Sequence, residues 1–187
     1  MNSMAPKSQR GTSLVEVLVT MVILAIGLLA LAGLQARLHV LQIESYQRAQ
    51  ALMLLRDMSS RISNNRYQAA SYATVAPLGT GDDCPAPDAT RQGDDVAEWC
   101  NIIKGASETV DAGAVMVGTL VGGRGCVEDL GGGEYMVTVA WQGLAPISAP
   151  PAFVTCGQDQ YDRPGSQCDD DLCRRVVTTL IHIPTLT

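Results

Sequence analysis

One apolar segment constrains this chain more than any other feature. Residues 14–34 contain a single charged side chain, Glu16. As a helix these positions extend roughly 31 Å, at about 1.5 Å per residue, against a bilayer hydrocarbon core of about 30 Å. The segment therefore predicts a membrane-spanning helix, in which an ionised carboxylate costs roughly 2.5–3.5 kcal/mol. We expect Glu16 to have a function and a partner that offsets this cost.

The residues before this segment indicate how it is processed. Lys7 and Arg10 are the only charges among the first ten residues, and Gly11 follows them. An ordinary secretory signal has an apolar region of about 7–15 residues without an acid, and a small-residue cleavage site after it. Residues 30–32, Ala-Leu-Ala, have that cleavage form, but the length of the segment and Glu16 disfavour this interpretation. A plain membrane anchor with a tolerated acid near its end is a further alternative.

The order of residues from Gly11 onward resembles the class III signal of type IV pilins. Gly11 and Thr12 are followed by Ser13-Leu14-Val15-Glu16-Val17-Leu18-Val19 and a long aliphatic run. The resemblance implies that a prepilin peptidase cuts after Gly11 on the cytoplasmic side and methylates Thr12. Glu16 is then the fifth mature residue, where the family keeps a glutamate that meets the N-terminal amine of a neighbouring subunit.

Simple physics agrees with that role for Glu16. Thr12 and Glu16 are four residues apart, so they lie one above the other on a helix face. Two charges that are each costly in lipid cost less when they are paired. Glu16 is therefore expected to favour stacking of subunits in one axial register. Two positions depart from the family: Thr12 stands where Phe is commonest, and Gly33 stands where major pilins have a helix-bending Pro.

A softer resemblance extends over most of the chain. Residues 11–35, 49–52 and 139–143 resemble PilV-type minor pilins, the type IV pilus modification proteins. This resemblance implies a pilin fold and a non-enzymatic subunit that primes pilus assembly with other minor pilins, near the pilus tip. Such pili serve twitching motility and cell adhesion. The implied partners are other minor and major pilins, the prepilin peptidase and the inner-membrane assembly platform.

Charge distribution predicts the topology. Removal of residues 1–11 takes away Lys7 and Arg10, which changes the formal charge from −6 to −8. An acidic chain argues against unspecific nucleic-acid binding. Because the two basic residues precede the apolar segment, the positive-inside rule keeps the N-terminus cytoplasmic. We expect a leader at 1–11, a transmembrane helix at 12–36 and an exported domain at 37–187, first in the inner membrane and then on the pilus surface.

Six cysteines follow the apolar segment, and an even number in an exported domain indicates disulfides. Six cysteines allow fifteen pairings, so the sequence alone does not choose among them. We expect Cys84–Cys100, Cys126–Cys156 and Cys168–Cys173. Zinc would need Cys and His at tight spacing, whereas His39 and His182 are far from the one tight cysteine pair, so no zinc site is expected.

Periodicity predicts an α+β fold. Apolar residues recur at steps of three and four, so the helix should continue through residues 37–67 and stop near Asn64-Asn65. Residues 77–95 are expected to form a loop and residues 97–103 a short helical turn. Strands are expected at 114–121, 135–141 and 176–183, with a weaker one at 124–128. This order predicts an antiparallel sheet packed on the second half of the helix. Loops 77–95 and 143–173 are the predicted surfaces for partner contacts.

Signs of chemistry are few. The glycines at 122–125 and 131–133 lack the pattern of a nucleotide loop, so no cofactor is expected. Acidic pairs and triplets at 82–83 and 169–171 leave loop calcium as an alternative, although the EF-hand pattern is absent. The rival functions are a minor pseudopilin of a type II secretion system and a membrane-anchored periplasmic enzyme or binding module. A DNA-receptor pilin would need exposed basic residues, for which Arg174-Arg175 is the strongest doublet.

Overall fold

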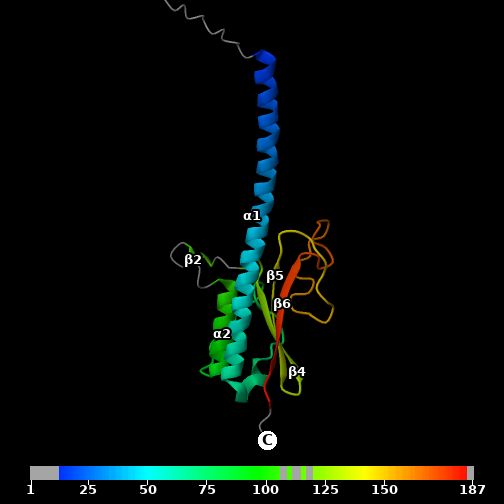
Figure 1. The fold of residues 1–187 in the computed structure, drawn as a ribbon. Coiled ribbons are helices and arrows are strands. Elements are labelled where there is room, and N and C mark those ends of the chain that lie inside the picture. Colours follow the sequence, from blue (N-terminus) through cyan, green and yellow to red (C-terminus); the bar gives the residue numbers. More distant parts are fainter. Residues whose placement is uncertain (1–12, 106–108, 111–114, 117–119, 185–187) are drawn as a thin grey trace, which may run out of the picture. The chain divides into compact units, whose positions relative to one another are not determined.

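The computed structural model describes residues 13–105, 109–110, 115–116 and 120–184. The chain divides into two compact units, residues 1–42 and residues 43–187. Helix α1 (Leu14–Asn64) is 51 residues long and belongs to both units (Figure 1). Strong helix formers and the absence of Pro explain its length. The predicted long helix is confirmed, and it ends at the Asn64-Asn65 pair that was expected to stop it.

The second unit contains a four-stranded antiparallel sheet in the order β1-β4-β5-β6. The strands are β1 (Leu78–Gly79), β4 (Arg124–Gly131), β5 (Glu134–Gln142) and β6 (Arg174–His182). A separate two-stranded ladder joins β2 (Thr109–Val110) to β3 (Val115–Met116). The predicted antiparallel sheet and three of its strands are confirmed. The strand expected at 114–121 falls largely outside the described residues, and in its described part only β3 is a strand.

One face of β5 forms the centre of the core. Tyr135, Val137, Val139 and Trp141 alternate along the strand and are all buried, as the alternation predicted. They belong to one apolar cluster with the buried face of the second half of α1. The α1 residues in this cluster are Ala51, Leu54, Leu55, Met58 and Ile62. The sheet therefore packs on the part of α1 that lies in the second unit.

A second helix was underestimated from the sequence. Helix α2 (Arg91–Lys104) begins within the segment expected to be a loop and is 14 residues long. Thr90 caps it, because the Thr90 hydroxyl accepts a hydrogen bond from the Gly93 N–H at 3.0 Å. The indole N–H of Trp99 donates to the carbonyl oxygen of Leu54 at 3.0 Å, which ties α2 to α1. A short 3₁₀ helix, η1 (Arg66–Tyr72), links the end of α1 to the segment before β1.

The other face of the sheet is also covered. Thr138 and Ala140 of β5 are fully buried there, although they alternate with the core residues. Residues 143–173, the covering segment, pack on this face. They contribute Cys156 and Tyr161 to a second apolar cluster. Part of this segment, which was predicted to be a surface for partner contacts, is therefore buried against the sheet. Only parts of it remain exposed, including Phe153, which is 71% exposed.

Candidate functional site

The N-terminal candidate site lies at the first turn of α1. The Glu16 N–H donates to the carbonyl oxygen of Ser13 at 2.9 Å, and the Val17 N–H donates to the same oxygen at 3.3 Å. These two bonds close the first helical turn, with the Glu16 carboxylate in it. An acidic residue is favourable at this end of a helix, because the unpaired N–H groups there carry partial positive charge. Gly11 and Thr12, the expected processing residues, lie outside the described residues.

The surface of α1 around Glu16 is apolar on all sides. Every residue from Ser13 to Ile43 is exposed, including large side chains such as Leu14 (80%) and Leu29 (73%). Within the described residues, α1 is the only helix long and apolar enough to cross a membrane, and its apolar part is not buried by this chain. A helix that is apolar all round needs lipid or other apolar helices around it. This surface is consistent with a membrane anchor and with packing between subunits.

Glu16 has no ionic partner within the described part of the first unit. Its nearest charged neighbour along the helix is Arg37, 21 residues later. Those residues span about six helical turns, so an intrahelical pair is excluded. Within the described part of the first unit, no charged side chain can therefore pair with the Glu16 carboxylate.

The second unit is held by an ion cluster at the end of α1. The Arg61 guanidinium contacts Asp57 at 2.9 Å, Asp95 at 3.0 Å and Glu98 at 2.8 Å. Burial alone would lower the pKa of Arg61, but hydrogen bonds to Glu98, Asp57 and Asp95 outweigh it and raise this pKa. Arg61 in turn holds the pKa of Glu98 below its usual value. This cluster fastens α2 to α1, which is a structural role.

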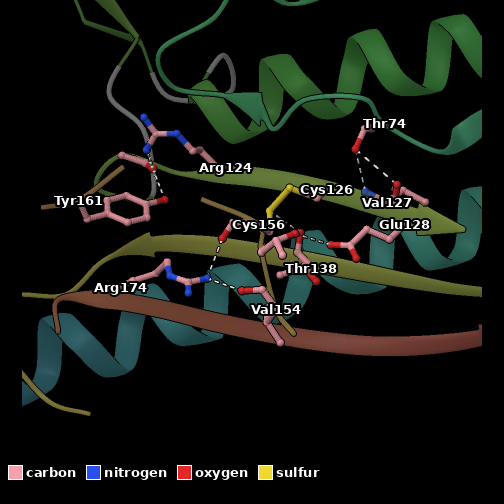
Figure 2. Close-up of a disulfide and its surroundings, with 12 residues drawn as sticks. Thr74, Arg124, Cys126, Val127, Glu128, Thr138, Val154, Cys156, Tyr161 and Arg174 are labelled. Atoms are coloured by element: carbon pink, nitrogen blue, oxygen red, sulfur yellow. Dashed lines mark hydrogen bonds between the residues drawn. A yellow bond between two sulfur atoms is a disulfide. The ribbon is translucent and has the colours of Figure 1, made fainter. Parts of the chain in front are cut away.

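Disulfides brace the loops that were predicted to meet partners. The structure brings the six cysteines together as Cys84–Cys100, Cys126–Cys156 and Cys168–Cys173. The first bond fixes the loop before α2 to that helix. The second joins β4 to the segment that covers the outer face of the sheet (Figure 2). Loops fixed in this way lose little conformational entropy on binding, which suits a recognition surface.

The residue that anchors residues 143–173, the covering segment, was not apparent from the sequence. Arg174 is 2% exposed, and its guanidinium donates to the carbonyl oxygens of Val154 at 2.7 Å and Cys156 at 3.1 Å (Figure 2). Its charge is balanced by Asp171 at 2.8 Å. The signal was present as Asp171 and Arg174, which are three residues apart where β6 begins.

The basic doublet is not a joint basic surface. Arg174 and Arg175 are consecutive in β6, so their side chains lie on opposite faces of the sheet. The Arg174 guanidinium forms an ion pair with the Asp171 carboxylate, and the Arg175 guanidinium contacts the Glu44 carboxylate of α1 at 3.3 Å. The doublet therefore does not provide the exposed basic patch that a DNA-receptor pilin would need.

Three carboxylates gather in the covering segment. Oxygen atoms of Asp159, Asp162 and Asp171 lie within 4.8 Å of one another. Contacts within the chain already engage the carboxylates of Asp171 and Asp162. The Asp171 carboxylate accepts the Asp159 N–H at 3.0 Å and pairs with Arg174. The Asp162 carboxylate accepts the Asp171 N–H at 2.8 Å. The cluster differs from the 169–171 triplet and the 82–83 pair considered for calcium. These contacts alone do not indicate a cation.

The remaining sequence candidates belong to different elements. His39 is exposed on α1, and His182 is exposed at the end of β6, 3.9 Å from Glu134. The glycines at 131–133 end β4 and form the tight connection to β5. Their positive φ angles, between 64° and 84°, explain why glycine is needed in this turn.

Comparison with known proteins supports the N-terminal site. Residues 6–32 match the family model described as the prokaryotic N-terminal methylation motif. The matched range contains Gly11, Thr12 and Glu16. The comparison with curated proteins and the comparison with solved structures gave no match.

The chain thus combines a prepilin-type N-terminal motif with a long apolar helix and an α+β, pilin-like fold. This combination supports a type IV pilin-like or pseudopilin subunit that is anchored in a membrane. It points to a structural subunit rather than an enzyme. The motif also implies contact with a prepilin peptidase and with other pilins in general.

Proposed function

We propose that this protein is a minor pilin of the PilV type, made as a precursor and built into a type IV pilus. The observation that supports this most is the isolated Glu16 in the exposed apolar helix, within a matched methylation motif. The peptidase cuts after Gly11, and Thr12 becomes the methylated first residue. Residues 12–36 anchor the subunit in the inner membrane, and residues 37–187 form the exported domain.

Assembly in this proposal is driven by the pairing of two groups that are costly in lipid. The new amine of Thr12 on one subunit approaches the Glu16 carboxylate of its neighbour, so neither charge remains unpaired. The apolar side chains of α1 then leave the lipid and pack against the helices of other subunits. The subunit works with other minor pilins at the inner-membrane assembly platform to prime the pilus, and is located near the pilus tip.

The decisive experiment is the intact mass and N-terminal sequence of protein extracted from membranes. A product that begins with methylated Thr12 supports the proposal. Retention of Met1, or a product that begins after Ala32, refutes the proposed processing. Sheared pili should also contain the protein, at low abundance relative to the major pilin.

A minor pseudopilin of a type II secretion system is the second candidate, because the same motif and the same Glu16 serve its assembly. Deletion of the gene distinguishes the two functions. Loss of pili and twitching with normal secretion supports the pilus, whereas loss of protein secretion with normal pili supports the secretion system.

A further inference from the structure

Among the described residues, no strand pairs with the outer edge of strand β6. It is the last strand in the order β1-β4-β5-β6, and it pairs with β5 along all nine of its residues (Figure 1). Nine residues of strand extend about 30 Å, at roughly 3.4 Å per residue. An edge of this length presents a row of backbone donors and acceptors that another strand can pair with.

The hydrogen-bond alternation shows which backbone groups point away from the sheet. The Ile183 N–H donates to Gly133 O at 2.8 Å, and the Gly143 N–H donates to Cys173 O at 2.8 Å. Both bonds continue the register of the β5–β6 ladder, so odd-numbered residues of β6 bond to β5. The outward N–H and C=O groups therefore belong to even-numbered residues. These are Val176, Thr178, Leu180 and His182, and none has a hydrogen bond to another described element.

The middle of β6 carries none of the residues that usually block strand pairing at an edge. From Val176 to Ile181 there is no charged residue and no Pro. Thr178 is exposed, and Leu180 is 65% exposed. Soluble proteins usually blunt a long edge with a charge, a Pro, a bulge or a covering segment.

The opposite edge of the same sheet is closed in several of these ways. β1 pairs with the first two residues of β4. The Thr74 N–H then donates to Val127 O at 2.8 Å, and the Val127 N–H donates to the Thr74 hydroxyl at 3.1 Å. Beyond this point the edge carries Glu128 and Asp129, and the pairing with β5 becomes irregular. Among the described residues, the two edges therefore differ, because only the β4 edge has strand pairing, charged residues and an irregular register.

The direction of β6 restricts what the partner can be. Arg175, near the start of the strand, contacts Glu44 of α1, and Ile183, just after its end, lines one cavity with Arg66, just after the end of α1. β6 therefore runs in the same direction as residues 44–64 of α1. Two copies paired antiparallel through β6 about a two-fold axis would have these helices pointing in opposite directions. Subunits anchored in one membrane by their N-terminal helices point the same way.

We propose that the β6 edge binds an extended segment of a different filament subunit, which joins the sheet as an additional strand. Main-chain hydrogen bonds to Val176, Thr178, Leu180 and His182 hold the segment. An uncharged, β-branched segment fits best, because Thr178 and Leu180 would contact its side chains. That the partner belongs to the same filament rests on the proposed function, whereas the strand addition itself does not.

A photo-crosslinking residue in place of Leu180, in the full-length protein in its native membrane, tests the proposal directly. The matched control places the same residue at Leu130, which is 50% exposed on β4. We expect an adduct with another pilin from position 180 and none from position 130. An adduct with a second copy of this chain, equal adducts from both positions, or no adduct from position 180 would overturn the proposal.

Paired backbone variants give an independent measurement. Thr178→Pro removes an outward N–H without touching the bonds to β5, whereas Thr178→Val keeps that N–H. Thr178→Pro should reduce co-purification of the crosslinked partner by about tenfold or more, and Thr178→Val by less than about twofold. Equal recovery with both variants contradicts strand addition. If the fluorescence of Trp99 and Trp141 shows that Thr178→Pro does not fold, the crosslinking result at position 180 alone determines whether the proposal stands.

These outcomes are separable from those of the proposed function. Failure of the proposed function appears as an uncut N-terminus or absence from sheared pili, whatever position 180 contacts. Failure of the strand addition appears as normal processing and normal recruitment together with no specific adduct at position 180.

Discussion

Replacement of Arg174 by Met tests how the second face of the sheet is covered. The guanidinium bonds two backbone carbonyl oxygens and the Asp171 carboxylate, and both charged side chains are nearly buried. Met fills a similar volume but leaves the Asp171 carboxylate without an ionic partner in a site where it is only 7% exposed. Removal of one partner of a buried ion pair costs about 3–5 kcal/mol. We expect the free energy of unfolding of the Arg174→Met variant to fall by that amount.

The assay is denaturant unfolding of the full-length protein in detergent. Trp99 and Trp141 are both buried in the second unit, so their fluorescence reports its unfolding. Arg163→Met is a matched control, because Arg163 is an exposed residue of the same segment, and it should change stability by less than about 0.5 kcal/mol.

A double variant separates the ion pair from general damage. Arg174→Met combined with Asp171→Asn removes the stranded charge, while the Asn oxygen can still accept the Asp159 N–H. The double variant should be about 1–2 kcal/mol more stable than Arg174→Met alone. A loss below about 1 kcal/mol for Arg174→Met, or a double variant less stable than the single one, would refute this reasoning.

Three further predictions concern other parts of the chain. Glu16→Gln should leave cleavage and membrane insertion intact but lower the recovery of the protein in sheared pili about tenfold or more. Immunoblots of sheared pili and of the membrane fraction measure this recovery, and a normal value would contradict the role of the charge. Gly125→Ala should destabilise the second unit by about 1–3 kcal/mol in the same unfolding assay, because the new methyl group would collide with the Trp99 ring. An unchanged denaturant midpoint would show that the Trp99 ring moves aside at little cost. Burial and the hydrogen bond to Asp95 raise the pKa of Tyr72 from 10.0 to about 12, so its stabilisation is complete below pH 10 and is lost between pH 10 and 12. Between unfolding titrations at pH 9 and pH 11.5, the free energy of unfolding should fall by about 1–2 kcal/mol more in the wild type than in Tyr72→Phe, and equal falls would exclude this linkage.

Much of the fold could be predicted because its signals are local. The apolar run and the absence of Pro define α1, and strict alternation defines β5 together with the face that it buries. The even cysteine count indicated disulfides, but it left fifteen pairings open, so the connectivity itself did not follow from this local signal. The prepilin motif is likewise a short contiguous pattern, which explains why a family model matches it.

Other features depend on contacts between distant residues, and the sequence concealed them. Helix α2 begins among polar residues and a glycine, and its stability comes from the Thr90 cap and from Trp99 buried against α1. The segment 143–173 resembles a solvated loop, yet Arg174 and the Cys126–Cys156 bond hold it on the sheet. Proline and glycine content predicts irregular backbone, but it does not predict whether that backbone is exposed.

The order of the disulfides has a consequence for how the domain matures. Each cysteine is bonded to the next one along the chain, so no bond encloses another. A polypeptide whose exported residues enter an oxidising compartment in chain order presents Cys84 and Cys100 before any wrong partner has arrived, and the later pairs follow in turn. Sequential oxidation therefore yields the final connectivity without reshuffling, and an isomerase should be dispensable for this protein even where it is needed for nested bonds.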